Sequence, residues 1–258
     1  MQDQFSRTRA LLGQAAIHRL NESRVAIFGL GGVGGHTVEA LVRSGVGHFA
    51  LFDDDKICLT NLNRQIIATH QTVGAYKVDV MKERILDINP RAQVETHRVF
   101  YGPAVADEFD LGNYDYIVDA IDTVTAKLEL VSRAHAAGTP IVSAMGTANK
   151  LDPTAFSVTD IFQTENDPLA RVMRRELRKR GVTALRVVYS REKARKPLED
   201  LTKACKQNCV CPPDVARDCT VRRQIPASSA FVPGTAGLIL AAEVVKALCG
   251  LLDTEVGP

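Results

Sequence analysis

The stretch RVAIFGLGGVGGHTVEALVRSG, residues 24–45, decides the fold. It opens with a short apolar run that contains β-branched side chains, which is the pattern of a buried strand. Residues 36–45 have helical spacing and end at Gly45, where a helix commonly stops. Between these segments lies a G-x-G-x-x-G pattern formed by Gly29, Gly31 and Gly34. Such glycines allow a tight turn and the close approach of a phosphate to the N–H groups of a helix start. The stretch therefore predicts a strand, a phosphate-binding turn and a helix.

Strand and helix patterns alternate from residue 24 to residue 146. The predicted strands are 24–30, 47–53, 92–99, 114–122 and 139–146, and the predicted helices are 36–45, 75–90 and 124–138. This order predicts an α/β fold with a doubly wound, mainly parallel, Rossmann-like sheet and helices on both faces. Residues 8–20 form a further predicted helix before it. We expect residues 1–150 to be a nucleotide-binding core.

Residues 151–258 have a different pattern and predict a mixed C-terminal extension packed on the same domain. Its predicted parts are strands 155–161 and 184–190, a charged helix 168–180, a long mobile loop 191–223 and an apolar helix 234–250. The extension therefore adds both strands and helices to the core.

The composition is that of a soluble globular protein, with 45% hydrophobic and 24% charged residues in a chain of 258. No continuous apolar run is long enough to span a membrane, and the N-terminus lacks the apolar region of a secretory signal. We therefore expect a cytoplasmic protein without a membrane partner. In that compartment the six cysteines read as reduced thiols or metal ligands.

Charge is unevenly distributed along the chain. Residues 171–223 carry 16 Lys/Arg and 6 Asp/Glu, a local net charge of +10, although the whole chain carries only +2. Such a basic segment indicates either a polyanionic partner or a solvated loop. Composition does not decide between them.

The segment LFDDDKICLTNLNRQ, residues 51–65, concentrates polar side chains directly after a predicted strand. Asp53 lies nineteen residues after Gly34, where dinucleotide-binding proteins place the acid that holds ribose, so an NAD-dependent oxidoreductase is one reading. Asp55 lies two residues on, so an extended backbone directs both carboxylates to one face, and the second could hold a divalent cation. Singly, these residues could be ordinary turn residues.

Two cations and a third carboxylate favour a triphosphate over a dinucleotide. Arg64 and Lys77 follow the acidic segment, and Asp122 ends a predicted strand at the sheet edge where ligands bind. A departing pyrophosphate requires cations to stabilise its charge. Singly, Arg64 and Lys77 would read as surface cations, but jointly the cluster predicts ATP with Mg²⁺, and Asp122 is a second candidate metal ligand.

These motifs together resemble the adenylation domain of the ubiquitin-activating-enzyme-like family. The family signature D-x-D-x(5)-N-x-x-R-Q is matched by Asp53, Asp55, Asn61, Arg64 and Gln65. The resemblance implies the following roles: Asp53 for ribose, Asn61, Arg64 and Lys77 for phosphates, Asp55 and Asp122 for Mg²⁺, and Arg7 for the phosphates of a neighbouring subunit. It also implies a homodimer and allows a monovalent cation.

The second half of the chain resembles bacterial tRNA threonylcarbamoyladenosine dehydratases, in LDPTAFSVTDIFQTENDPLARVMRRELRKRG and SSAFVPGTAGLILAAEVVKAL. This resemblance implies ATP-dependent cyclisation of a modified adenosine in tRNA. A sulfur-carrier-protein activator is the alternative, and cysteine desulfurases or sulfur acceptors would be further partners. The zinc-binding C-x-x-C pairs of those activators do not occur in this sequence. A non-catalytic, nucleotide-regulated binding module is a further alternative.

Two more groups of residues are candidates for binding. Helical spacing places Arg171, Arg174, Arg175 and Arg178 on one cationic stripe, and such stripes bind phosphate backbones or remain solvated. Four thiols lie close together in the basic segment, namely Cys205, Cys209, Cys211 and Cys219. They could hold a metal or be redox-active, although their spacing matches no standard metal motif. Cys58 and Cys249 lie in apolar patterns and read as core residues.

Overall fold

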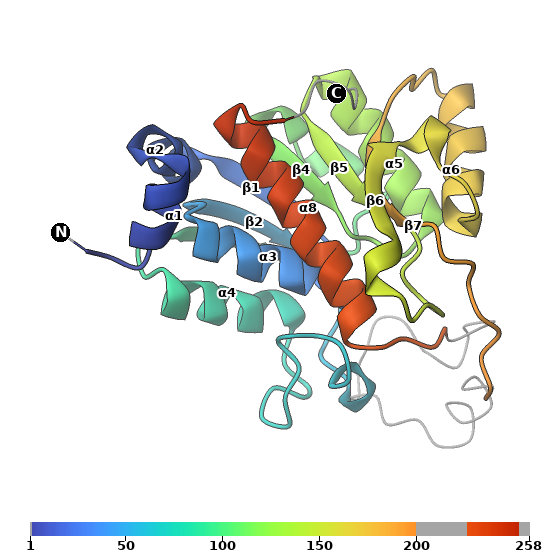
Figure 1. Cartoon of the computed structure of the whole chain (residues 1–258), viewed down its shortest axis with the longest axis horizontal. Helices are drawn as coiled ribbons and strands as arrows, with labels where there is room; N and C mark the ends of the chain where they lie inside the picture. The colour runs from blue at the N-terminus through green and yellow to red at the C-terminus, as the bar shows by residue number, and fades with distance from the viewer. Residues whose placement is uncertain (1, 200–225, 253–258) are drawn as a thin grey trace.

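The computed structural model describes residues 2–199 and 226–252, which form one seven-stranded sheet with helices on both faces (Figure 1). The strand order is β3-β2-β1-β4-β5-β7-β6. The strands are β1 (Arg24–Phe28), β2 (His48–Phe52), β3 (Gln93–His97), β4 (Tyr116–Asp119), β5 (Ile141–Ala144), β6 (Phe156–Asp160) and β7 (Arg186–Ser190). All neighbouring pairs are parallel except β6 with β7. The predicted α/β fold with a doubly wound sheet is confirmed.

The helices follow the predicted segments closely. They are α1 (Ser6–Leu12), α2 (Gln14–Glu22), α3 (Gly34–Ser44), α4 (Lys77–Ile88), α5 (Val124–Ala137), α6 (Pro168–Lys179) and α8 (Phe231–Cys249). Short 3-10 helices occur at η1 (Leu59–Asn61), η2 (Ala106–Glu108), η3 (Leu111–Asn113), η4 (Pro153–Ala155) and η5 (Ile161–Gln163). The prediction of one continuous helix over 8–20 is wrong, because this segment forms two helices, α1 and α2. Gly13 adopts a φ of +86° and separates α1 from α2, which is a conformation that favours glycine.

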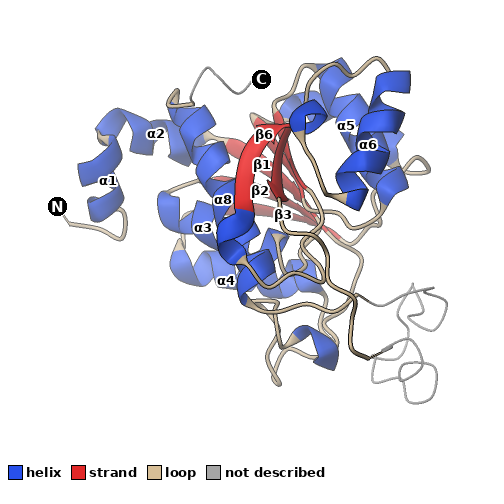
Figure 2. Ribbon diagram, turned by 45° about the vertical axis from the view of Figure 1, so that its right-hand side comes forward, coloured by secondary structure: helices blue, strands red, loops and turns tan. Residues whose placement is uncertain are grey.

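Each face of the sheet is buried by a different group of helices (Figure 2). Alternate residues of β1 show this, because Val25 and Ile27 belong to the core cluster that includes α3, α4 and α8. Ala26 and Phe28 instead belong to the cluster that includes α5. Strands buried on both faces are expected in a parallel sheet, where crossover helices cover both sides.

The C-terminal extension continues the same sheet. β7 pairs in parallel with β5, with Val142 opposite Arg186, and β6 then pairs antiparallel with β7. The strands predicted at 155–161 and 184–190 are therefore present and lie at one side of the sheet. In the predicted loop 191–223, residues 191–199 contain no helix or strand, and residues 200–223 lie outside the described part of the chain.

The apolar helix α8 lies across α3 (Figure 1). The two backbones approach closely at Gly237, whose carbonyl accepts a 3.0 Å hydrogen bond from the Thr37 hydroxyl. Among the described helices, α8 alone is long and apolar enough to span a membrane by length and composition. Half of its apolar window is buried in the domain, and its Glu243 forms a buried ion pair with Arg186 of β7. Its packing is that of a core helix.

Candidate active site

The glycine turn lies between β1 and the first turn of α3, at the carboxyl end of the strand. Gly29 has a φ of +91°, and a Cβ there would lie 2.7 Å from the Ala120 carbonyl oxygen. A Cβ on Gly34 would lie 1.8 Å from the Gly29 carbonyl oxygen. At Gly31, by contrast, a Cβ would meet no atom of the described part of the chain within 4 Å. Gly29 and Gly34 are therefore required by packing, whereas Gly31 borders open space that a phosphate could enter.

The strand order reverses at this turn. β1 lies between β2 and β4, so the crossover connections depart in opposite directions from the carboxyl ends of β1 and β4. In open α/β sheets this switch point is where ligands bind. The turn after β1, the acidic segment after β2 and the connection after β4 meet there, as the sequence predicts.

The acidic segment is held in place by backbone hydrogen bonds. Asp53 is buried, and its carboxylate accepts hydrogen bonds from the N–H of Leu30 at 2.7 Å and of Asp55 at 2.9 Å. The first of these bonds ties the segment to the glycine turn. Burial raises the pKa of Asp53, and the attraction of a nearby cation opposes that rise.

Lys77 is that cation. Its ammonium lies 2.7 Å from Asp55 Oδ2 and 3.6 Å from Asp53 Oδ1, and its side chain is only 6% exposed. Burial lowers the pKa of Lys77, but the carboxylates of Asp53, Asp55 and Asp122 outweigh burial and raise it. The predicted convergence of Asp53, Asp55 and Lys77 is therefore present in the structure.

The carboxylates of the segment could hold a divalent cation. Asp53, Asp54 and Asp55 can each offer an oxygen within 4.8 Å of the others, and hard oxygen ligands suit Mg²⁺. Asp122 is not in this close group. Its side chain is exposed on the β4–α5 connection, where it accepts a 3.2 Å hydrogen bond from Thr123, and its charge reaches Lys77.

Arg64 and Asn61 lie on the loop that follows the acidic segment. The Arg64 guanidinium donates to the Thr60 carbonyl and to the Asn63 side chain, each at 2.9 Å. A Cβ on Gly32 would lie 3.4 Å from Arg64 Cγ, so this arginine borders the glycine turn. The Asn61 side chain accepts a 3.0 Å hydrogen bond from the Cys58 N–H and thereby shapes the loop.

Arg7 lies at the other end of the sheet. The neighbouring Phe5 is buried and packs at Gly45, just after α3, whereas the glycine turn precedes α3. A helix of eleven residues is about 16 Å long. The exposed Arg7 is therefore separated from the glycine turn of its own chain by about that length.

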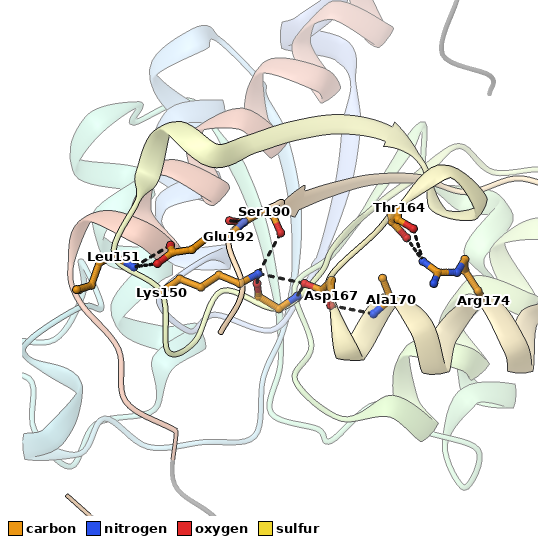
Figure 3. Close-up of polar contacts among 9 residues, drawn as sticks. Lys150, Leu151, Thr164, Asp167, Ala170, Arg174, Ser190 and Glu192 are labelled. Atoms are coloured by element: carbon orange, nitrogen blue, oxygen red, sulfur yellow. Dashed lines mark hydrogen bonds and ion pairs between the residues drawn. The ribbon is translucent and has the colours of Figure 1, made fainter. Parts of the chain in front are cut away.

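The basic helix α6 is anchored to the carboxyl end of β5 (Figure 3). Asp167 caps the helix by accepting from the Ala170 N–H at 2.9 Å, and it also accepts from the Gly146 N–H at 3.1 Å. The buried Lys150 ammonium lies 3.2 Å from the same carboxylate. The sequence did not predict the ion pair between Asp167 and Lys150, although Asp167 followed by Pro168 is a recognisable helix start.

The four arginines of α6 are not equivalent. Arg171, Arg175 and Arg178 are exposed, whereas Arg174 is half-buried and donates to the Thr164 carbonyl at 2.7 Å and to its hydroxyl (Figure 3). Arg178 stacks over the Phe162 ring at 5.0 Å. A groove of about 820 Å³ is lined by Asn166, Asp167, Pro168, Arg171, Val172, Arg174, Arg175 and Arg178. The side chains suited to a polyanion are thus the three exposed ones.

The cysteine predictions divide in two. Cys58 and Cys249 are both buried, so their core placement is confirmed. The candidate cluster Cys205, Cys209, Cys211 and Cys219 lies outside the described residues.

Comparisons with known proteins agree with this geometry. The chain is 41% identical over 260 residues to the Bacillus subtilis tRNA threonylcarbamoyladenosine dehydratase, covering 99% of this chain and 98% of that protein. The Escherichia coli protein of the same name is 38% identical over 174 residues, covering 67% of this chain and 65% of that protein.

Solved structures and a family profile give the same relationship. The E. coli tRNA N6-threonylcarbamoyladenosine dehydratase in complex with AMP matches with a TM-score of 0.82 at 30% identity, over 96% of this chain and 94% of that chain. E. coli MccB with ATP matches at 0.65 and 19% identity, over 98% of this chain and 65% of that chain, and shows the fold alone. The profile of the ThiF family matches residues 5–257. The chain belongs to the ThiF family.

Proposed function

We propose that this protein is an ATP-dependent, ligase-type dehydratase that cyclises threonylcarbamoyladenosine in tRNA. One observation carries the proposal: the glycine turn, Arg64, Lys77 and the carboxylates of the acidic segment meet at the switch point of a chain that matches a dehydratase of that name along its whole length. These groups are those that adenylation of a carboxylate requires.

The reaction needs two displacements. An oxygen of the threonine carboxylate attacks the α-phosphorus of ATP, and the bond to the β-phosphate breaks to release pyrophosphate. The carbamoyl group of the same nucleoside then attacks the acyl carbon and loses a proton, and AMP leaves with the original carboxylate oxygen. The nucleoside thereby loses the elements of water. The second step is intramolecular, so its effective molarity reaches about 10⁵ M or more without an enzyme nucleophile.

The residues of the site have distinct roles in this scheme. Asp53 would hold the ribose, and Asn61, Arg64 and Lys77 would bind phosphates. Arg64 and Lys77 would stabilise the charge that develops as pyrophosphate departs. Mg²⁺ would add charge neutralisation when bound, and Asp55 with Asp122 are the residues proposed to hold it.

The exposed stripe of α6 is the proposed contact with tRNA. Arg171, Arg175 and Arg178 present three cations beside one groove, and each phosphate contact adds about 0.9 to the salt slope of binding. Changing all three to glutamine should lower that slope by about 2 to 3 while ATP affinity stays unchanged. The matched control removes three cations elsewhere, Arg43, Lys82 and Arg91. An unchanged slope in the α6 variant would refute this contact.

A homodimer is proposed from the apolar exterior of α8. Phe231 and Leu238 are 51% and 53% exposed on one face, which also includes Ala242 and Val245. Exposed apolar side chains on the outer face of a helix favour cover by a partner. A second copy would supply that cover, and the family resemblance separately leads us to propose that Arg7 serves the site of the neighbouring subunit. Leu238→Glu should shift the protein to the monomer in sedimentation experiments, and an unchanged dimer would place the interface elsewhere.

The remaining expectations concern location and partners. We propose that the protein works in the cytoplasm, where tRNA and ATP are available. The proposed reaction transfers no sulfur and therefore gives no role to a cysteine desulfurase or sulfur acceptor. A monovalent cation likewise stays a prediction.

The decisive assay incubates the protein with ATP, Mg²⁺ and tRNA that carries threonylcarbamoyladenosine. Mass spectrometry of the nucleoside should show loss of water, with one AMP released for each ring closed. Arg64→Ala should slow AMP release by about 10²- to 10³-fold, which is the effect of removing one preorganised donor. Arg43→Ala, at the far end of α3, is the control. Consumption of ATP without change in the nucleoside would refute the proposal and favour activation of another carboxylate, such as a carrier-protein C-terminus.

A further inference from the structure

A fully buried ion pair lies beneath the connection from β4 to α5. Lys127 Nζ is 2.9 Å from Asp119 Oδ2, and both side chains are 0% exposed. The Ser143 hydroxyl of β5 donates to the same carboxylate oxygen at 2.5 Å. None of these three residues has a role in the scheme above.

Stability alone does not account for such a pair. Removing two charges from water costs about as much as their attraction returns, and well-packed neutral residues often stabilise a core equally well or better. The pair does, however, fix a short piece of chain. Asp119 ends β4 and Lys127 lies in the first turns of α5, while Asp119 Oδ1 accepts from the Ile121 N–H at 3.2 Å. Both ends and the middle of the connection are thereby held.

This connection borders the nucleotide site at two points. Its Ala120 packs against the glycine turn so closely that a Cβ on Gly29 would lie 2.7 Å from the Ala120 oxygen, and one on Gly34 would lie 3.2 Å from the Ala120 Cβ. Its next residues include Asp122, one of the three carboxylates whose charge reaches Lys77. A shift of the connection would therefore displace both the phosphate turn and a carboxylate of the site.

We propose that Lys127 and Asp119 are positioning residues that hold Asp122 and the glycine turn in the arrangement that binds Mg·ATP. The inference rests on the proposed function for its use of ATP. In this proposal the ion pair contacts neither the substrate nor the metal. It acts by fixing the connection between β4 and α5, which carries Asp122 and packs against the glycine turn.

The test compares two doubly neutralised variants. Asp119→Asn/Lys127→Met removes the charges of this pair. The amide oxygen of Asn can still accept the hydrogen bond from the Ile121 N–H, and its NH2 group can donate to the Ser143 hydroxyl. The control is Arg186→Met/Glu243→Gln, which removes a comparably buried pair with a 2.6 Å contact. Arg186 is the first residue of β7, which runs parallel to β5, so the control pair lies at the amino end of the strands. The glycine turn lies at the carboxyl end of the strands.

Three quantities are measured: the urea midpoint, the affinity for ATP with and without Mg²⁺ by calorimetry, and the rate of AMP release with the modified tRNA. We expect both variants to fold and the control to keep wild-type affinity. The Asp119/Lys127 variant should lose at least tenfold of its Mg·ATP affinity and about 10²-fold in rate, the cost of a displacement of about 1 Å at a reacting site.

The alternatives give different results. Wild-type Mg·ATP affinity and rate in the Asp119/Lys127 variant, or equal losses in the control, would overturn the inference. If that variant does not fold, Ser143→Ala removes one hydrogen bond and keeps the pair. It should lower Mg·ATP affinity about threefold, and an unchanged affinity would also overturn the inference. A wild-type protein that binds Mg·ATP but leaves the nucleoside unchanged would refute the proposed function instead, while the affinity comparison would still test the pair.

Discussion

Replacing Lys77 with methionine should destabilise the protein in a pH-dependent manner. The change leaves the carboxylates of Asp53 and Asp55 without the ammonium that lies 3.6 Å and 2.7 Å from them. Loss of one partner from a buried pair costs about 3–5 kcal/mol. Because the Asp55 side chain is 36% exposed, water solvates part of the remaining charge, so we expect about 3 kcal/mol. With a urea m-value of about 3 kcal/mol per M, the midpoint falls by about 1 M.

The sign of the pH effect follows from Asp53. Burial already raises its pKa above the ordinary 3.8, and loss of Lys77 removes the opposing attraction, so the pKa rises further. The folded variant then binds a proton more readily than the unfolded chain. Its stability deficit is therefore largest above the raised pKa and shrinks as the pH falls through it. Urea unfolding at pH 7.5 and pH 5.0 should show a smaller difference from wild type at pH 5.0.

Two controls separate this effect from a general loss of charge. Lys82→Met changes a lysine of the same helix outside the acidic segment and should cost less than about 0.5 kcal/mol. Lys77→Met/Asp53→Asn should recover part of the lost stability, because the two changes remove interacting partners. An equal deficit at both pH values, or no deficit, would refute the assigned electrostatics.

Three further outcomes are expected from single substitutions. Gly34→Ala places a Cβ 1.8 Å from the Gly29 carbonyl oxygen, so the turn must shift and the ATP affinity measured by calorimetry should fall at least 100-fold. Wild-type affinity in this variant would show that the turn does not bind the phosphates. Gly237→Ala brings a Cβ within 2.4 Å of the Val33 oxygen and should cost about 2 kcal/mol in urea unfolding; a gain, as helix propensity alone predicts, would refute the close crossing. Burial raises the pKa of Glu39, but hydrogen bonds from arginines, chiefly Arg84, lower it overall, so its contribution is present above pH 4.5 and lost as the pH falls through the lowered value. The Tm deficit of Glu39→Gln should therefore be largest near pH 7 and should shrink below about pH 4.

The alternation of strands and helices was predictable because it depends on local apolar periodicity. The two buried faces of β1 require a continuous apolar run, and Gly45 ends α3 in the left-handed conformation that its sequence position indicates. The ends of elements were less accurate. The strand predicted over 114–122 ends at Asp119, since the chain leaves the sheet at the switch point to pack against the glycine turn.

The candidate site was predictable where residues follow neighbouring strands. Asp53 and Asp55 lie directly after β2, and the strand order brings them to the turn after β1. Contacts through space were not readable in this way. Helical spacing predicts that Arg174 and Arg175 are equally available to a polyanion. In the structure Arg174 instead donates a hydrogen bond to the Thr164 carbonyl, whereas Arg175 is exposed. Lys127 resembles any helix lysine until the fold buries it.

The crossing of α3 and α8 has a consequence for biosynthesis. Thr37 and Gly237, which meet there, are 200 residues apart in the sequence. During translation, the nascent chain presents the apolar face of α3 long before α8 leaves the ribosome to cover it. Contacts between residues so far apart in the sequence slow folding and prolong the exposure of hydrophobic surface that can aggregate. The apolar face of α3, the helix that begins at the phosphate turn, is therefore buried late in synthesis. A ribosome that stalls before residue 231 would hold a nascent chain with this face exposed, which would need a chaperone.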